Sequence, residues 1–148
     1  MRFFDHALET MSPKAIEALQ IEKFRSMFKK IYGHNRFYTE KFDSAGIDHE
    51  AIQNVNDMAQ IPLTNKEDLI KAQQDKPPFG SNATFPESAY SRFHQTSGTT
   101  GKPLRVLDTP ESWEWWGRCW GFVLTGAGLT ENDRLFVPFS FGPFIGFW

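Results

Sequence analysis

The chain has 148 residues, and its 16 Lys and Arg against 18 Asp and Glu give a net charge of −2 at pH 7. A nucleic-acid-binding protein of this size normally carries a clustered basic excess, so nucleic acid is excluded as the expected partner. The single cysteine, Cys119, excludes an internal disulfide, and residues 1–6 lack the apolar run of a secretory signal. Together these features predict a cytoplasmic protein.

Aromatic and charged residues are distributed unevenly along the chain. Residues 1–80 contain 9 aromatic and 23 charged residues, whereas residues 81–148 contain 14 and 11. The stretch Leu135–Trp148 carries no charge, but it is shorter than the about 20 apolar residues that cross a bilayer, and prolines interrupt it. We therefore expect no membrane span and expect this stretch to be buried against protein.

The charged part, residues 1–80, predicts a helical region. Ser12 and Pro13 are typical of a helix N-cap and first position, and apolar residues recur at helical spacing from there to Ile31, before a stop at Gly33. Shorter helices are expected over Phe37–Ala45, over Asn56–Ala59 and, behind a capping box at Thr64–Glu67, from Asn65 to about Gln74. No histidine here has metal-ligand spacing, so we expect neither a metal site nor a catalytic residue in this part.

The aromatic part, residues 81–148, predicts strands alternating with a helix. Tyr90–Gln95 and Leu104–Leu107 have strand character, and a helix begins at Thr109-Pro110 and ends at Gly126 and Gly128. A third strand is expected over Leu135–Phe139. A strand, a helix and a strand in this order indicate a βαβ unit with a parallel sheet, and hence an α/β fold.

The predicted helix after Thr109 is apolar around much of its circumference. One apolar stripe is formed by Trp113, Trp116, Trp120 and Val123, and a second by Trp115, Cys119 and Phe122. A helix of this kind is normally buried on two sides, so we expect Cys119 to be a small buried thiol. A tryptophan-lined ligand site is the alternative.

The segment from Thr96 to Pro103, between the first two predicted strands, combines four hydroxyl side chains, two glycines and one lysine. Glycines let backbone N–H groups approach an oxyanion closely, hydroxyls donate hydrogen bonds, and Lys102 adds a mobile positive charge. The spacing is not that of a Walker A loop, because Gly98 and Gly101 are too close together and Pro103 follows the lysine. The residues alone leave two alternatives, a phosphate-binding loop and a polar hairpin turn.

The same eight residues, Thr96 to Pro103, resemble the phosphate-binding signature of the acyl-adenylate-forming enzymes, which include acyl-CoA synthetases, peptide-synthetase adenylation domains and luciferases. Three further segments resemble the phenylacetate–CoA ligase branch of that superfamily, namely Leu8–Pro13, Lys41–Gly46 and Leu63–Leu69. The resemblance covers essentially the whole chain. It implies that residues 1–80 form a peripheral helical N-terminal region and that residues 81–148 begin the large α/β adenylating domain, which is incomplete in this chain.

The resemblance implies a two-step reaction that depends on ATP and Mg²⁺. A small aryl or acyl carboxylate becomes an acyl-adenylate with release of pyrophosphate, and the thiol of coenzyme A then displaces AMP. By matching positions, the ATP phosphates are assigned to Thr96, Ser97, Gly98, Thr99, Thr100, Gly101 and Lys102. The hydroxyls would donate hydrogen bonds, the glycines would shape the loop, and Lys102 would meet phosphate charge. Leu104-Arg105 replaces the Lys-Gly of many superfamily members, which favours the aryl branch.

The resemblance also places Phe141 and Gly142 in the acyl or aryl pocket, with buried core as the alternative. It assigns no catalytic residue and no Mg²⁺ or coenzyme A site to this chain, and it allows a homodimer of the full-length form. We therefore expect an N-terminal fragment of an AMP-forming ligase that is inactive alone. Two alternatives stay open, a non-catalytic nucleotide- or phosphate-binding module and an adenylating enzyme that acts on a cofactor instead of forming a CoA thioester.

Overall fold

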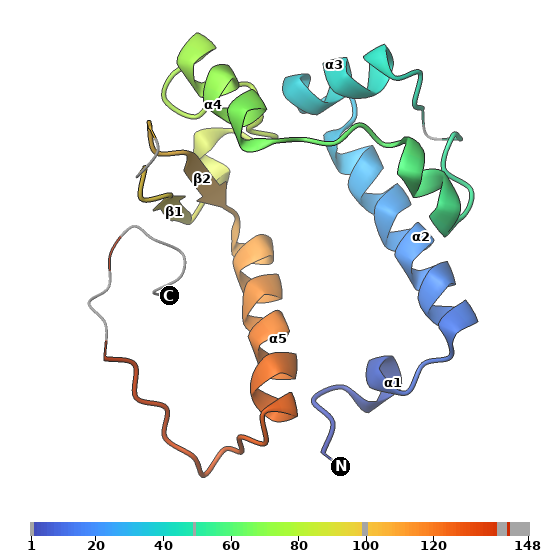
Figure 1. Cartoon of the computed structure of the whole chain (residues 1–148), viewed down its shortest axis with the longest axis vertical. Coiled ribbons are helices and arrows are strands. Elements are labelled where there is room, and N and C mark those ends of the chain that lie inside the picture. The colour runs from blue at the N-terminus through green and yellow to red at the C-terminus, as the bar shows by residue number, and fades with distance from the viewer. Residues whose placement is uncertain (1, 49, 99–100, 139–141, 143–148) are drawn as a thin grey trace.

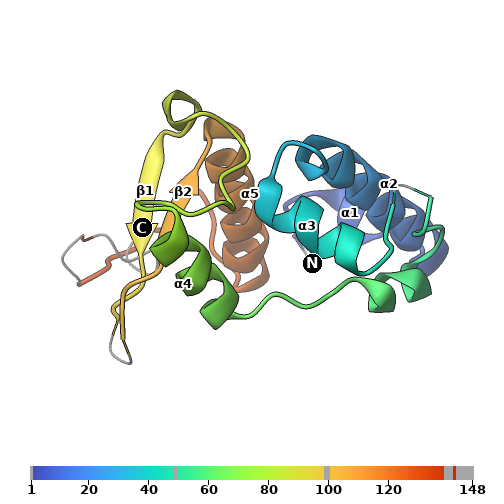
Figure 2. The same cartoon turned by 90° about the horizontal axis from the view of Figure 1, so that it is seen from above.

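The computed structural model describes residues 2–48, 50–98, 101–138 and 142. Its elements, in chain order, are α1 (His6–Glu9), α2 (Pro13–Ile31), α3 (Arg36–Ser44), the 3₁₀ helix η1 (Val55–Gln60), α4 (Lys66–Asp75), the 3₁₀ helix η2 (Glu87–Ala89), β1 (Arg92–Gln95), β2 (Arg105–Asp108) and α5 (Pro110–Gly126). In Figure 1 α2 stands on the right and α5 in the middle, and α3, α4 and the sheet lie toward the top. Seen from above, α5 lies between the sheet and the pair α2 and α3 (Figure 2).

The helices begin where side-chain caps satisfy their first backbone N–H groups. The Ser12 hydroxyl accepts the Ala15 N–H at 3.3 Å, and the Thr109 hydroxyl accepts the Ser112 N–H at 3.1 Å, with proline following each cap. Both predicted starts are therefore confirmed. The capping box of α4 was predicted one residue too early, because Asn65 and not Thr64 is the cap and Asp68 completes the box. Asn and Thr both cap well, and each is followed three residues on by an acidic side chain, Asp68 or Glu67, so the sequence alone does not distinguish them.

The helical part has a hydrophobic core of its own. This core contains Ile21, Phe28, Phe42, Ile47 and Ile52. Phe28 and Phe42 come from α2 and α3, and their ring centroids lie 5.0 Å apart. The apolar periodicity of α2 thus predicted the packed face only in part, because Phe28 is buried but Ile16 and Met27 are exposed.

The sheet differs from the predicted one. β1 and β2 pair antiparallel, with Gln95 opposite Arg105, so the segment between them closes a hairpin. The predicted parallel pair was β2 with a third strand across α5, so the hairpin of β1 and β2 does not contradict that pairing. In the described residues 135–138 no strand is present, so the predicted βαβ unit is wrong for the part of the chain described here, and Phe139 lies outside it. Helices and this small sheet still make an α/β arrangement.

α5 is far more exposed than predicted. It has no fully buried residue, Cys119 is exposed, and Trp115, Trp120 and Val123 are 47%, 43% and 56% exposed. Phe136, in the stretch predicted to be buried, is 85% exposed. The described neighbours of α5, which are β2, the residues around Phe4 and a few side chains of α2, cover it only in part. Even so, no helix in the described ranges combines the length and apolar character needed to cross a membrane.

The helical part and the sheet part are joined by contacts between residues far apart in the sequence. Lys30 and Glu111 form an ion pair at 2.7 Å, and the rings of Phe4 and Phe122 meet edge to face at 5.0 Å. The buried Asn35 donates from its side-chain amide to the Asn82 carbonyl at 2.7 Å. α1 and α2 are thus fixed against the elements that hold the predicted loop, and the domain division at residue 80 stays a prediction.

Candidate phosphate-binding loop

The loop between β1 and β2 is closed at its base by Thr96. The Thr96 backbone N–H donates to the Leu104 carbonyl at 2.9 Å, and the Leu104 N–H donates to the Thr96 hydroxyl oxygen at 2.9 Å. The side chain thus replaces one backbone acceptor of the strand ladder. Its O–H proton remains able to donate to a ligand. Thr96 therefore has a structural part in the loop that sequence reasoning did not assign to it.

Two glycines determine the path of the loop. Gly98 has a φ of +68°, and its carbonyl accepts the Gly101 N–H at 2.9 Å. A Cβ at position 98 would stand 2.9 Å from the Gly101 carbonyl oxygen and from Pro103 Cγ, which is closer than real side chains come. Gly101 also has a positive φ, of 155°. Glycine at position 98 is therefore required both by its dihedral angle and by its neighbours.

The polar groups of the loop that the structure describes point outward. Ser97, Gly101 and Lys102 are exposed, and Lys102 also borders an open groove of about 390 Å³. The groove is lined by Ile70, Gln73, Gln74, Pro77, Lys102, Pro103 and Arg105. An exposed hydroxyl and an exposed ammonium on a glycine-shaped turn can bind an anion without first breaking internal bonds.

The structure does not describe every predicted site residue of the loop and of the acyl or aryl pocket. Thr99, Thr100 and Phe141 lie outside the described residues. Gly142 is described and is partly exposed. The aryl or acyl pocket at Phe141 and Gly142 therefore stays a prediction.

Two side chains beside the loop were missed by sequence reasoning. Gln73 on α4 hydrogen-bonds the backbone of Arg105, the residue that begins β2. His94 on β1 is 2% exposed; its Nε2 lies 3.2 Å from an oxygen of Asp108, and its ring stacks on Trp113 at 5.4 Å. Only the alternation of β1 could have indicated that His94 faces inward. Nothing in the pattern of α4 distinguishes Gln73 from its neighbours.

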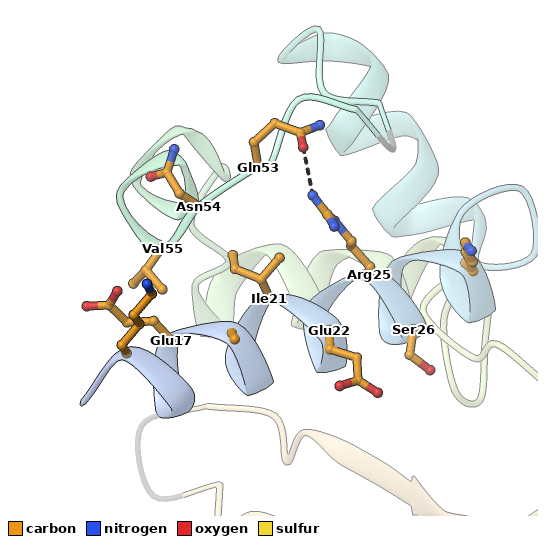
Figure 3. A pocket seen from close by; sticks show the side chains of 11 residues that line it. Glu17, Ile21, Glu22, Arg25, Ser26, Gln53, Asn54 and Val55 are labelled. Atoms are coloured by element: carbon orange, nitrogen blue, oxygen red, sulfur yellow. Dashed lines mark hydrogen bonds between the residues drawn. The ribbon is translucent and has the colours of Figure 1, made fainter. Parts of the chain in front are cut away.

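A second hollow lies apart from the loop, between α2 and residues 53–55. Its volume is about 680 Å³, and Arg25 crosses it to donate to the side-chain oxygen of Gln53 at 2.7 Å (Figure 3). Its lining carries charges of both signs and contains none of the predicted site residues. Within the described ranges no three His, Cys, Asp or Glu side chains gather as metal ligands. The hairpin loop therefore remains the candidate site.

Comparison with known proteins finds CoA ligases among the relatives of this chain. Phenylacetate-coenzyme A ligase of Escherichia coli (strain K12) is 32% identical over 139 residues, which are 94% of this chain and 31% of that protein. The enzyme of the same name from Thermus thermophilus is 32% identical, with 94% and 30% covered. The crystal structure of 2-hydroxyisobutyryl-CoA ligase in complex with 2-HIB-AMP and CoA matches with a TM-score of 0.77 at 26% identity, over 84% of this chain and 26% of that one. No family model matches the chain.

These matches place the chain in the adenylate-forming family, a class that includes AMP-forming acyl-CoA ligases. Within that class the chain belongs to the phenylacetate–CoA ligase-like branch of the adenylate-forming family. It spans about a third of the length of the curated relatives that it matches, at 31% of the Escherichia coli enzyme.

Proposed function

We propose that this chain supplies the ATP-phosphate-binding loop of a ligase that converts an aryl or acyl carboxylate into its CoA thioester. The observation that carries the proposal is the hairpin loop at Thr96–Pro103, shaped by glycine and presenting Ser97 and Lys102 to solvent. Its place in a chain that is 32% identical to a phenylacetate–CoA ligase over 94% of its length supports the same assignment.

In the proposed reaction the loop stabilises a leaving group. The carboxylate oxygen bonds to the α-phosphorus of ATP, the bond to the bridging oxygen breaks, and pyrophosphate leaves with its negative charge. Ser97 and the threonine hydroxyls donate hydrogen bonds to that charge, and Lys102 neutralises part of it. The thiol of coenzyme A then displaces AMP from the acyl-adenylate. The contribution of this chain is positioning and electrostatic stabilisation, without a covalent intermediate.

We assign no Mg²⁺ or coenzyme A site to the described residues. The described residues contain no cluster of side chains that could hold a metal ion. Mg²⁺ that accompanies ATP is usually held by the phosphates and one or two carboxylates, and no step is assigned to it here. We also infer that the 148 residues alone do not catalyse adenylation, because they match only 31% of the Escherichia coli relative.

The test is binding of pyrophosphate to the 148-residue chain, measured by isothermal titration calorimetry beside the Lys102→Ala variant. Losing one charge-assisted contact should weaken pyrophosphate binding by about tenfold. Lys14→Ala, which removes an equal charge from α2 far from the loop, is the matched control and should bind as the unmodified chain does. Equal affinities in Lys102→Ala and Lys14→Ala, or no binding at all, would overturn the assignment. Exchange of pyrophosphate into ATP by the chain with an aryl acid would refute its inactivity alone.

A further inference from the structure

We propose that Gln73 is a positioning residue that fixes the C-terminal arm of the loop, residues 102–105, so that Lys102 presents its charge at a constant place. This proposal rests on the phosphate-binding function proposed above. It assigns a task to α4, which otherwise only packs beside the sheet. Gln73 does not touch the phosphates in this proposal; it acts through the backbone of Arg105.

The contact between Gln73 and Arg105 is a pair of hydrogen bonds. The Gln73 amide nitrogen donates to the Arg105 carbonyl at 2.6 Å, and the Arg105 N–H donates to the Gln73 amide oxygen at 3.0 Å. A side-chain amide has the same donor and acceptor as a peptide unit. Gln73 therefore binds Arg105 in the way that a neighbouring strand would.

The strand geometry explains why Arg105 is available for this contact. Leu104 directs its N–H and its carbonyl toward Thr96 on the β1 side. Successive residues of a strand direct their backbone groups to opposite edges, so those of Arg105 face away from β1. Without Gln73 this outer edge would present an unpaired N–H and carbonyl.

The surroundings of Gln73 are shaped around its side chain. Gln73 is 9% exposed, and a Cβ at Gly80 would lie 3.1 Å from both its Cγ and its backbone nitrogen. The Arg105 guanidinium adds a third tie, because it donates to the Pro78 carbonyl at 3.2 Å. The arm after Lys102 is thus attached to α4 and to the turn behind it at neighbouring points. Lys102 stands three residues before Arg105, between this attachment and the Gly98 turn.

The loop then has two independent fixed points. Thr96 closes its base through Leu104, and Gln73 holds the next residue from the opposite side. Replacing Gln73 by an apolar side chain leaves both backbone groups of Arg105 without partners, which costs more than a hydrogen bond formed in water contributes. The arm should loosen locally, while the core of α2 and α3 does not contain Gln73 and should be unaffected.

The experiment compares Gln73→Leu with Gln74→Leu in the 148-residue chain. Gln74 is exposed, follows Gln73 on α4 and borders the same groove, but only Gln73 hydrogen-bonds Arg105, so Gln74 is the matched control for that contact. Amide hydrogen exchange of Leu104 and Arg105 should speed up by roughly tenfold in Gln73→Leu, as expected for one lost hydrogen bond, and stay unchanged in Gln74→Leu. Gln73→Glu keeps the acceptor for the Arg105 N–H and loses the donor. Its exchange rates should therefore fall between those of Gln73→Leu and Gln74→Leu. This variant also decides the outcome if Gln73→Leu does not fold.

Pyrophosphate titration of the same variants separates the two proposals. Weaker binding in Gln73→Leu than in Gln74→Leu, together with faster exchange, supports positioning. Equal exchange rates in the two leucine variants would overturn it, as would faster exchange with unchanged pyrophosphate affinity. If the unmodified chain binds no pyrophosphate, the phosphate-binding function itself fails. The exchange rates then still decide whether Gln73 holds the arm.

Discussion

Asp68 stabilises the start of α4 from two directions. Its side chain accepts the Asn65 N–H at 3.2 Å as part of the capping box, and it accepts from the Lys41 ammonium at 2.8 Å. The hydrogen bond from Lys41, followed by that from the Asn65 backbone, holds the pKa of the Asp68 carboxyl below its ordinary value. Lys41 belongs to α3, so this carboxylate joins the helical core to the helix that supports the loop.

Because the pKa of Asp68 is lower in the folded chain, its contribution to stability is present above the unfolded pKa of about 3.9 and is lost as the pH falls through the folded value. Lys41→Met should raise the pKa of Asp68 and make the unfolding midpoint less sensitive to acid. The measurement is an NMR titration of the Asp68 carboxyl with urea unfolding between neutral and acidic pH. Arg36→Met, which breaks an exposed ion pair with Glu40, is the control and should leave the Asp68 titration unchanged. An unshifted Asp68 pKa in Lys41→Met would contradict this account.

Residues that hydrogen-bond their sequence neighbours could be predicted from the sequence. Residues that contact distant parts of the chain could not. Ser12 and Thr109 were identified as caps because a cap and its acceptor are set by neighbouring positions. Gln73 hydrogen-bonds Arg105, 32 positions away, and no pattern within α4 predicts this contact. The phosphate assignment of the loop came from its resemblance to a known signature, since the residues alone left a polar turn as an equal alternative.

At the scale of elements, the β1–β2 hairpin and α5 show why pairing is harder to predict than element type. The strands were predicted within two residues of their actual bounds, but the pattern did not establish that they pair antiparallel with each other, and β2 was assigned a parallel partner beyond α5. An alternating strand pattern records which side chains face the core and says nothing about which strand lies alongside. The apolar circumference of α5 predicted burial on two sides, but the described residues cover only part of the helix and leave Cys119 exposed.

Two glycines of α5 have different surroundings. A Cβ at Gly117 would meet nothing within 4 Å, whereas a Cβ at Gly121 would collide with the ring of Phe4. Phe4 also packs edge to face on Phe122, and Asp5 next to it accepts from Arg118 at 3.3 Å. The absence of a side chain at Gly121 therefore lets the N-terminal residues lie directly on α5.

Gly117→Ala should raise the free energy of unfolding by about 0.5–1 kcal/mol, because alanine loses less backbone entropy than glycine in a helix interior. Gly121→Ala should gain none of this, since the Phe4 ring must move. Thermal unfolding followed by circular dichroism checks both variants. Gly121→Ala combined with Phe4→Ala should recover helix stability relative to Phe4→Ala alone. Equal stabilisation by the two single alanines would show that Phe4 does not pack on Gly121.

At the scale of the whole molecule, α5 presents exposed apolar side chains on one stripe. Trp120 and Val123 lie three residues apart on one stripe of α5 and are 43% and 56% exposed. Trp116 stands beside Trp120, with ring centroids 6.1 Å apart. Contiguous exposed apolar patches of this kind mark surfaces that contact other protein. In the proposed ligase, parts beyond the 31% matched in the Escherichia coli relative would cover them.

The 148-residue chain should therefore bind a hydrophobic fluorescent dye, and the binding should depend on this stripe. Trp120→Gln with Val123→Gln should lower the dye fluorescence at saturation, because the two substitutions divide the patch. Leu63→Gln is the control: Leu63 is 92% exposed but lies apart from the stripe in the connection before α4, so its loss should leave dye binding unchanged. Circular dichroism of each variant establishes that the helices remain. Dye fluorescence that falls equally in Leu63→Gln and in the double variant would mean that the dye reports general loosening. In that case the apolar stripe of α5 would not be the surface that the rest of the ligase covers.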